Sequence, residues 1–424
     1  MQILSRNEYN HGELLRLMTA GSVDDGKSTL IGRLLHDAKS IPEDQLAAVA
    51  RSSRRRGIEG LDLSLLTDGL LAEREQGITI DVAYRYFSTP KRKFIITDVP
   101  GHEQYTRNMV TAASTASLAV LLVDARKGIV LQSRRHAYIA SLMGIANVVV
   151  AVNKMDLVNY SKDLFDEISK TFCQFAGSLN FRDVTAVPIS ALKGDMIVER
   201  GDKLSWYAGP TLMDRLETLA IDEDLNLHDL RFPVQWVCRP GTAPDHDFRG
   251  YAGRIESGVV AIGDSVTVLP SGRSSHVKQI LTMDGALKRA LAPQSVTLLL
   301  ENDIDISRGD MIVKNRDGAR VARAYEAELC WFDARPLDLR RRYSIKHTTK
   351  TVKALIPRVR YLVDVSNLRK VEGKSELYMN DIARVEVTVQ QPLVIDSYIR
   401  NRSTGSFIVI DDATHNTVAA GMIV

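Results

Sequence analysis

The sequence predicts an α/β domain with a mostly parallel sheet and flanking helices, followed by two β-rich domains. Up to about residue 225, short apolar runs alternate with helical patterns, which is the βαβ signature of a parallel sheet. After residue 226, short alternating strands are separated by glycines, a pattern typical of β-barrels. We therefore expect domains at residues 1–225, 230–317 and 318–424, in line with a length of 424 residues.

The first strand, at residues 15–18, leads into a glycine-rich loop with the sequence Gly-Ser-Val-Asp-Asp-Gly-Lys-Ser, and an apolar helical pattern follows. Glycines let such a loop turn its backbone N–H groups inward around a phosphate. Lys27 would reach the β- and γ-phosphates and Ser28 would ligate Mg²⁺. A chance glycine-rich turn is the alternative, but strand, spacing and the Lys-Ser pair all favour a phosphate-binding loop. The residues expected to contact the nucleotide here are Gly21, Ser22, Val23, Asp24, Asp25, Gly26, Lys27, Ser28 and Thr29.

A second motif selects the base. Asn153, Lys154 and Asp156 follow a very apolar strand at residues 148–152, at the carboxyl edge where parallel sheets bind ligands. The Asp156 carboxylate would accept two hydrogen bonds from guanine N1–H and N2–H₂, a donor pair that adenine lacks. The Lys154 stem can lie along the base plane. Alone, this motif could be a solvated helix cap.

A third motif supports guanine. Ser190, Ala191 and Leu192 follow another short strand at residues 186–189. The Ala191 backbone N–H would donate to guanine O6. Because this motif follows the phosphate loop and the Asn-Lys-Met-Asp motif in order, we expect the ligand to be GTP or GDP.

The γ-phosphate is expected to contact two further segments. The strand at residues 94–98 ends in Asp98, which can hold Mg²⁺ through water, and the Gly101 N–H can sense the γ-phosphate. The Thr79 hydroxyl would complete the metal shell only while the γ-phosphate is present, as in a switch loop. The expected metal ligands are therefore Ser28, Thr79 and Asp98.

His102 directly follows Gly101 and is expected to orient the attacking water. A lone histidine is more often a surface residue, but its position behind Asp-Val-Pro-Gly favours the catalytic interpretation. The predicted catalytic residues are His102, Thr79 and Lys27.

Together these motifs resemble the translation-factor GTPases, elongation factor Tu and elongation factor 1-alpha above all. More narrowly, the chain is similar to the GTPase subunits of bacterial ATP sulfurylase, in contrast to elongation factors, which usually carry His at the position of Ser22 and His or Ser at that of Asp25. This narrower resemblance is carried by the strings at residues 21–35, 43–49, 72–87 and 101–109. It implies a P-loop GTPase domain followed by two β-barrel domains.

The resemblance also implies an activity and a partner. GTP hydrolysis would be coupled to the synthesis of adenosine 5′-phosphosulfate and pyrophosphate from ATP and sulfate. A separate small catalytic subunit would form a heterodimer or larger assembly with this chain. The alternative is an elongation-factor-like GTPase that delivers aminoacyl-tRNA. A second phosphate loop, as in a fused adenylylsulfate kinase, does not occur in the sequence.

Composition indicates an ordinary soluble protein. The formal net charge is +3, and the three cysteines (Cys173, Cys238 and Cys330) form no metal-ligand spacing. The first eight residues lack the apolar core of a signal peptide, and the longest apolar runs are too short to span a bilayer. We expect a cytoplasmic protein with no membrane partner.

Two basic segments leave their roles open. Residues 51–57 are expected to be a solvated, mobile part of the first switch, with a nucleic-acid contact as the minor alternative. Residues 335–370 are also basic but interleave with apolar residues at strand period. A solvated sheet face, a protein-docking face and a tRNA-phosphate contact all fit that pattern, and the lack of stacking aromatics makes nucleic acid the least favoured.

Overall fold

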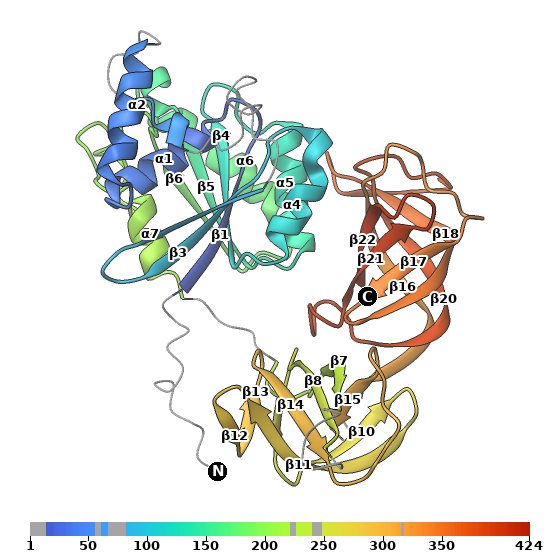
Figure 1. Cartoon of the computed structure of the whole chain (residues 1–424). Coiled ribbons are helices and arrows are strands. Elements are labelled where there is room, and N and C mark those ends of the chain that lie inside the picture. The colour runs from blue at the N-terminus through green and yellow to red at the C-terminus, as the bar shows by residue number, and fades with distance from the viewer. Residues whose placement is uncertain (1–13, 56–60, 67–81, 221–225, 240–247, 315–317) are drawn as a thin grey trace. The chain divides into compact units, whose positions relative to one another are not determined.

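The computed structural model describes residues 14–55, 61–66, 82–220, 226–239, 248–314 and 318–424. The chain divides into two compact units: residues 1–222 together with the short segment 365–368, and the rest of residues 223–424 (Figure 1). The predicted order of an α/β domain followed by β-barrels is confirmed. The domain boundaries at 225, 230, 317 and 318 stay predictions.

The first unit is built on a mostly parallel sheet with the strand order β2-β3-β1-β4-β5-β6. β1, β3, β4, β5 and β6 run parallel, and the edge strand β2 is antiparallel to β3. β4 is buried along its whole length, as expected of a strand covered on both faces. The strands are β1 Leu14–Ala20, β2 Ala83–Ser88, β3 Lys93–Asp98, β4 Leu118–Asp124, β5 Asn147–Asn153 and β6 Asp183–Pro188.

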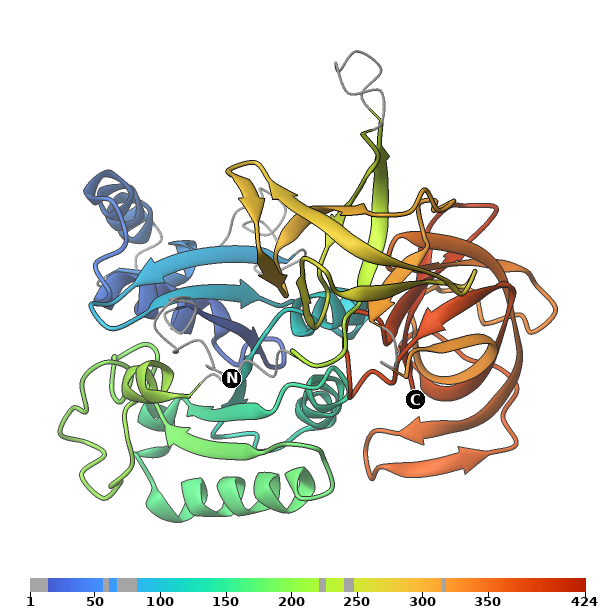
Figure 2. The ribbon, with the colours of Figure 1, turned by 90° about the horizontal axis from the view of Figure 1, so that it is seen from below.

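Helices cover both faces of this sheet (Figures 1 and 2). In α1, the apolar positions predicted from the sequence, Leu30, Ile31, Leu34 and Leu35, are all buried. The helices are α1 Lys27–Asp37, α2 Glu43–Arg55, α4 Thr106–Ala113, α5 Leu131–Leu142, α6 Lys162–Ala176 and α7 Leu212–Thr218, with short 3-10 turns η2 Leu63–Leu66, η3 Glu103–Tyr105 and η4 Met155–Val158.

In the segment predicted as a solvated, mobile part of the first switch, residues 51–57, the side chains of Arg51, Ser52, Arg54 and Arg55 are exposed. Its mobility stays a prediction. Residues 51–55 form the last turns of α2, and residues 56–60 lie outside the described residues. The helix has acidic residues in its first turn and Arg54 and Arg55 in its last turn, which suits the helix dipole. Ser53 is buried and donates to the Val49 carbonyl. The charges at both ends of α2 therefore stabilise the helix.

The second unit begins with a closed β-barrel. Its sheet has the order β10-β15-β7-β8-β14-β11-β12, and the additional pairing of β10 with β11 closes it. The strands are β7 Phe232–Cys238, β8 Gly250–Arg254, β9 Val259–Ala261, β10 Ser265–Leu269, β11 Arg273–Thr282, β12 Gly285–Leu287, β13 Arg289–Leu291, β14 Ser295–Leu300 and β15 Met311–Lys314.

A further barrel follows, with the order β17-β21-β22-β16-β20-β18-β19 closed by the pairing of β17 with β18. The last two strands, β21 and β22, pair as an antiparallel hairpin. The strands are β16 Arg320–Trp331, β17 Tyr343–His347, β18 Lys350–Asp364, β19 Arg369–Glu372, β20 Ile382–Ile395, β21 Ser406–Asp411 and β22 Thr417–Ile423.

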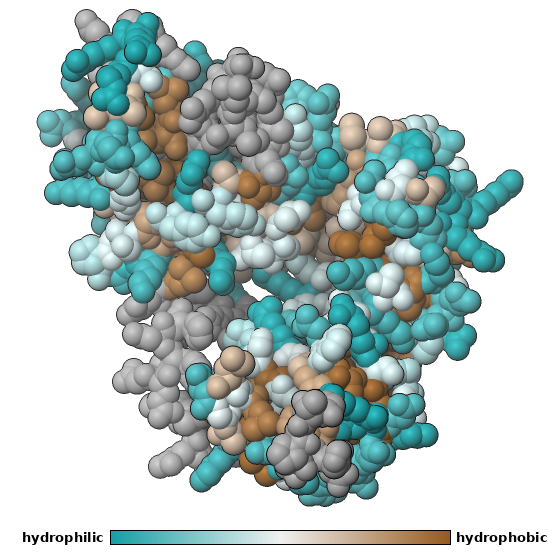
Figure 3. Space-filling view, in the orientation of Figure 1, coloured by the Kyte–Doolittle hydropathy of each residue, from teal (hydrophilic) through white to brown (hydrophobic). Residues whose placement is uncertain are grey.

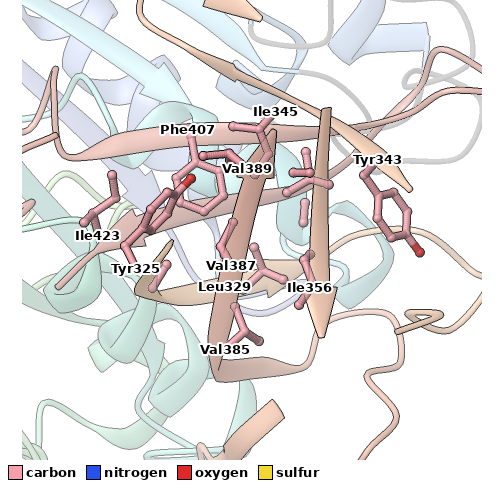
Figure 4. Close-up of a cluster of buried hydrophobic side chains, with 14 of the residues drawn as sticks. Tyr325, Leu329, Tyr343, Ile345, Ile356, Val385, Val387, Val389, Phe407 and Ile423 are labelled. Atoms are coloured by element: carbon pink, nitrogen blue, oxygen red, sulfur yellow. The ribbon is translucent and has the colours of Figure 1, made fainter. Parts of the chain in front are cut away.

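Figure 4 shows the apolar core of this last barrel. The rings of Tyr325 and Phe407 meet edge to face, with centroids 5.7 Å apart. Gly421 lies opposite Phe407 in the β-ladder, and a Cβ there would come within 2.2 Å of the phenyl ring. The hairpin therefore needs glycine at that position to admit the ring.

A buried ion pair joins the two barrels within the second unit. Arg231, just before β7, donates from Nε and Nη2 to both oxygens of Asp396, just after β20, at 2.8 and 2.9 Å. The two side chains are 0% and 4% exposed. The Thr404 hydroxyl also donates to Asp396. Charges this deeply buried are tolerated because their hydrogen bonds replace water.

Five basic side chains of the stretch at residues 335–370 pair with carboxylates of their own barrel. Arg335 and Arg341 both pair with Asp411, at 3.0 and 2.7 Å. Lys353 pairs with Asp412 at 2.7 Å, and other arginines of β18 face glutamates of β16 and β20. Hydrophilic residues cover much of this outer face in Figure 3. The arrangement favours a solvated sheet face over a phosphate-binding surface.

Among the described residues, none of the helices has both the length and the apolar character needed to cross a membrane.

Removal of the buried arginine should destabilise the second unit. Arg231→Gln leaves Asp396 buried without its bidentate partner, so we expect a loss of about 3–5 kcal/mol in the free energy of unfolding. The control is Arg400→Gln, whose pair with Asp229 is half exposed, and it should cost about 1 kcal/mol or less. Urea unfolding followed by tryptophan fluorescence measures both. Equal midpoints for Arg231→Gln and the parent would contradict the assignment.

Candidate functional site

The predicted site residues gather at the carboxyl ends of the parallel strands. β1 leads to the phosphate loop, β3 to Asp98, β5 to Asn153 and β6 to Ser190. Parallel strands place their carboxyl ends at one edge of a sheet, where open α/β folds bind ligands. Segments far apart in the sequence thus form one site.

The last residue of the phosphate loop before α1 has a backbone conformation that favours glycine. Gly26 has φ of +94° and forms the N-cap of α1 without a side-chain cap. A Cβ at this position would lie 2.5 Å from Asn153 Nδ2. The first backbone amides of α1 are therefore left to an anion, as at other helix N-termini that bind phosphate.

The Lys27 side chain is hydrogen-bonded to the backbone of the phosphate loop. It is buried, and its ammonium donates to the Gly21 and Ser22 carbonyls at 2.9 Å each. Burial lowers the pKa of Lys27, while the carboxylates of Asp98 and Asp25 act in the opposite direction. A buried ammonium in this position attracts an anionic group.

The loop carries two further polar features. Ser22 N–H donates to Asp25 Oδ2 at 2.6 Å, and burial raises the pKa of Asp25. The Ser22 hydroxyl is buried and has no hydrogen-bond partner among the described residues. Asp25 therefore shapes the loop, and Ser22 retains an unused polar atom. The remaining predicted loop residues Val23, Ser28 and Thr29 are half-buried, whereas Asp24 is exposed with φ of +67°.

The segment after β3 packs directly on this loop. Asp98 is buried and accepts a hydrogen bond from the Thr19 hydroxyl of β1 at 3.4 Å. A Cβ at Gly101 would lie 2.5 Å from Lys27 Nζ and 2.6 Å from the Gly21 carbonyl oxygen. Glycine is required here because the two backbones approach so closely.

Asn153 ties three loops together. Its Nδ2 donates to the Asp25 carbonyl at 2.8 Å, and its Oδ1 accepts from Ala191 N–H at 2.9 Å. The Ala191 amide, predicted to donate to guanine O6, thus has Asn153 as its partner in this structure. The sequence missed this bridging role because the three loops are distant in the chain.

Asp156 is oriented by Ser190. The Ser190 hydroxyl donates to Asp156 Oδ1 at 2.7 Å, and Ser190 itself is fully buried. Leu192 is 60% exposed, so it contributes its backbone to the site more than its side chain. The two motifs predicted to read guanine therefore lie side by side.

Three contacts around these motifs were not predicted. Lys154, with φ of +64°, pairs with Asp124 at 3.0 Å. Burial alone would raise the pKa of Asp124, but hydrogen bonds from Arg126 and Lys154 outweigh it and hold the pKa far below its usual value. Asp124 ends β4, so the same edge rule that selected Asp98 could have found it.

The other two contacts join elements that no local motif connects. Arg33 of α1 donates to the Ala191 and Leu192 carbonyls at 3.3 and 2.7 Å. Tyr160 donates to Asp195 Oδ2 at 2.7 Å. Both contacts clamp the Ser-Ala-Leu loop.

His102 is half-buried, directly after Gly101, with its ring edge to face with Tyr105 at a centroid distance of 6.2 Å. Thr79, predicted as a metal ligand and catalytic residue, lies outside the described residues. Asn153 links the phosphate loop to Ala191, whereas the His102 ring contacts the Gln104 N–H and Tyr105 of its own turn. The roles predicted for these residues stay predictions.

Comparisons with known proteins identify the family. Residues 12–222 match the family described as Elongation factor Tu GTP binding domain, and residues 324–424 match GTP-eEF1A C-terminal domain-like. The chain is 54% identical over 414 residues to sulfate adenylyltransferase subunit 1 from Bacteroides fragilis (strain YCH46), covering 97% of this chain and 86% of that relative. The chain belongs to the sulfate adenylyltransferase subunit 1 family. Its first 222 residues are accordingly a guanine-nucleotide-binding domain, as the motifs predicted.

The chain is also similar to another curated relative and, more distantly, to a solved structure. Bifunctional enzyme CysN/CysC from Mycobacterium tuberculosis (strain ATCC 25618 / H37Rv) is 54% identical over 411 residues, which cover 97% of this chain and 67% of that enzyme. The structure of sup35 complexed with GDP is 21% identical, with a TM-score of 0.44, and covers 100% of this chain and 97% of its own.

A substitution at Asp156 tests the guanine-reading interpretation. Asp156→Asn keeps an acceptor for the Ser190 hydroxyl but replaces an acceptor by a donor toward the base. We expect GTP binding to weaken by about 3 kcal/mol, roughly a hundredfold, because a mismatched buried charged group is costly. Xanthosine triphosphate, with oxygen in place of N2, should bind the variant better than the parent.

Equilibrium titration with fluorescent nucleotide analogues measures these affinities. Asp202→Asn is a matched control, since Asp202 is exposed, and it should bind GTP normally. Unchanged GTP affinity in Asp156→Asn would refute the assignment.

Proposed function

We propose that this chain is the regulatory GTPase subunit of an ATP sulfurylase. GTP hydrolysis would drive the conversion of ATP and sulfate to adenosine 5′-phosphosulfate and pyrophosphate. The observation that carries the proposal is the guanine-reading pair of Asp156 and Ser190, 2.7 Å apart beside a phosphate loop, in a chain of the sulfate adenylyltransferase subunit 1 family. We infer a cytoplasmic location.

A magnesium ion fits the residues present. Hydroxyl and carboxylate oxygens are the donors that Mg²⁺ prefers, and Ser28, Asp98 and Thr79 supply them. Ser28 lies in the first turn of α1 after β1, and Asp98 is the last residue of β3, the neighbour of β1 in the sheet. When bound, the ion would neutralise charge on the β- and γ-phosphates.

The side chains divide the remaining work. The Lys27 ammonium, now bonded to loop carbonyls, would hold the β- and γ-phosphates. The backbone N–H of Gly101 would sense the γ-phosphate, and the Thr79 hydroxyl would be held in place only in the triphosphate state. His102 would orient the attacking water. The unpartnered Ser22 hydroxyl suits a phosphate oxygen.

A separate small catalytic subunit completes the proposal. Relatives at 52–54% identity carry the name subunit 1, which suits a protein that works with a second chain. The site described here binds one nucleotide, so the adenylyl transfer is assigned to the partner. We infer a heterodimer or larger assembly. Delivery of aminoacyl-tRNA is the weaker candidate, because five basic side chains of residues 335–370 are already paired with carboxylates and the family relatives carry the name sulfate adenylyltransferase subunit 1.

Substitutions should separate nucleotide binding from hydrolysis. Lys27→Ala should impair GTP binding itself. His102→Ala should leave GTP affinity near normal and slow hydrolysis about a hundredfold, because water orientation matters chiefly in the transition state. Single-turnover hydrolysis with separate affinity measurements tests both variants. The control His228→Ala removes an exposed histidine of the second unit and should change neither quantity. Parental hydrolysis in His102→Ala, alone and with the partner, would disprove its role.

The division of labour is tested by product formation. We expect the purified chain to bind GTP but to make no adenosine 5′-phosphosulfate. With the small subunit, synthesis should be stimulated by GTP and supported less well by a non-hydrolysable analogue. The reason is that nucleotide binding alone cannot shift the equilibrium of a turnover reaction, whereas a hydrolysis cycle can.

Two outcomes would overturn the proposal. Synthesis by the isolated chain would refute the regulatory role. Tight, GTP-dependent binding of aminoacyl-tRNA with no response to sulfate would favour the elongation-factor alternative.

A further inference from the structure

The carbonyl of Gly101 is contacted by a side chain outside all of the sequence motifs. Gln132, in the first turn of α5, donates from Nε2 to the Gly101 oxygen at 3.4 Å. The same nitrogen lies 2.9 Å from His136 Nε2, one turn further along the helix. The two hydrogens of the Gln132 amide thus face the Gly101 carbonyl and the His136 ring, and Nε2 of that ring accepts in the tautomer that carries its proton on Nδ1.

The orientation of this amide is fixed on its other side as well. Arg135 Nη1 donates to Gln132 Oε1 at 2.9 Å. A flipped amide would place its NH₂ group against the guanidinium and its oxygen against the Gly101 carbonyl. Both contacts would then be repulsive, so Gln132 has a single favourable arrangement.

The neighbouring imidazole is suited to accept the second hydrogen. His136 is 2% exposed. Burial, together with the charges of Lys27 and Arg135, lowers the pKa of His136 to about 3, so the ring is neutral. A neutral ring accepts at one nitrogen, and Nε2 is the nitrogen that faces Gln132.

The opposite side of Gly101 is closed by the phosphate loop. A Cβ on Gly101 would meet Lys27 Nζ at 2.5 Å and the Gly21 oxygen at 2.6 Å. The Gly101 backbone therefore lies between the loop and Gln132. Because a peptide unit is planar, holding the Gly101 carbonyl also orients the N–H of His102.

We propose that Gln132 is a positioning residue for GTP hydrolysis. Its amide holds the plane of the Gly101–His102 peptide and thereby fixes the backbone position from which the His102 side chain extends. The proposal rests on the proposed function, because it assigns the benefit to the water-orienting step. Gln132 itself is assigned no contact with the nucleotide. Its loss should therefore slow hydrolysis and spare affinity.

The test uses the full-length chain with Gln132→Met, which has similar size but no hydrogen-bonding amide. We expect GDP and GTP affinities within about twofold of the parent and a single-turnover hydrolysis constant about tenfold lower, the effect of one lost hydrogen bond. Gln132→Glu should be slower still, because a carboxylate repels the Gly101 oxygen. Gln174→Met makes the same change on the exposed side of α6 and should have no effect.

A double-mutant cycle distinguishes positioning from general stability. If Gln132 acts through His102, then Gln132→Met should cause no further loss in a His102→Ala background. A full additional tenfold loss in that background would overturn the proposal, as would parental hydrolysis in the single variant.

An NMR readout separates this inference from the proposed function. With backbone and ring nitrogens of histidine labelled, Gln132→Met should shift the His102 amide and His136 ring signals in the GDP state, and Gln174→Met should not. Unchanged signals would refute the contact even if the chain hydrolyses GTP. Shifted signals in a chain without GTPase activity would support the contact while the proposed function fails.

Discussion

The nucleotide site depends on the buried amide of Asn153. One side-chain group accepts from the loop after β6, and the other donates to the phosphate loop after β1. The asymmetry of the amide, a donor beside an acceptor, lets a single side chain satisfy two backbone groups that would otherwise be buried without partners. A carboxylate could accept but not donate, so the same link could not form with aspartate in its ionised state.

Around that amide, charged side chains lie at the ends of strands. The carboxylates of Asp98 and Asp124 end β3 and β4, the strands on either side of β1 in the sheet, and face Lys27 and Lys154. Such groups are stable under burial because opposite charges lie within a few ångströms of each other. The result is that the buried ammonium of Lys27 lies close to the carboxylates of Asp98 and Asp25 at this edge of the sheet.

The second unit consists of two closed barrels that side-chain contacts join to each other. Each barrel closes its own sheet and leaves few open edges, so the barrels can be joined by side chains. The ion pair of Arg231 and Asp396 is accompanied by a small apolar cluster of Met311, Val313 and Val394. The bidentate ion pair constrains how the two barrels are oriented toward each other, and the apolar cluster buries hydrophobic surface between them. Together these contacts join the two barrels in one compact unit.

The sequence by itself determined the strand-to-helix order, the phosphate loop and the guanine-reading motifs, because each depends on residues adjacent in the chain. It could not show that Arg33, Gln132 and Tyr160 clamp these loops, since their partners lie on other elements. It also did not show that residues 51–55 end a helix, in which Arg54 and Arg55 complement the dipole of α2. Tertiary structure decided these contacts because hydrogen bonds depend on distance in space, and separation along the chain does not report it.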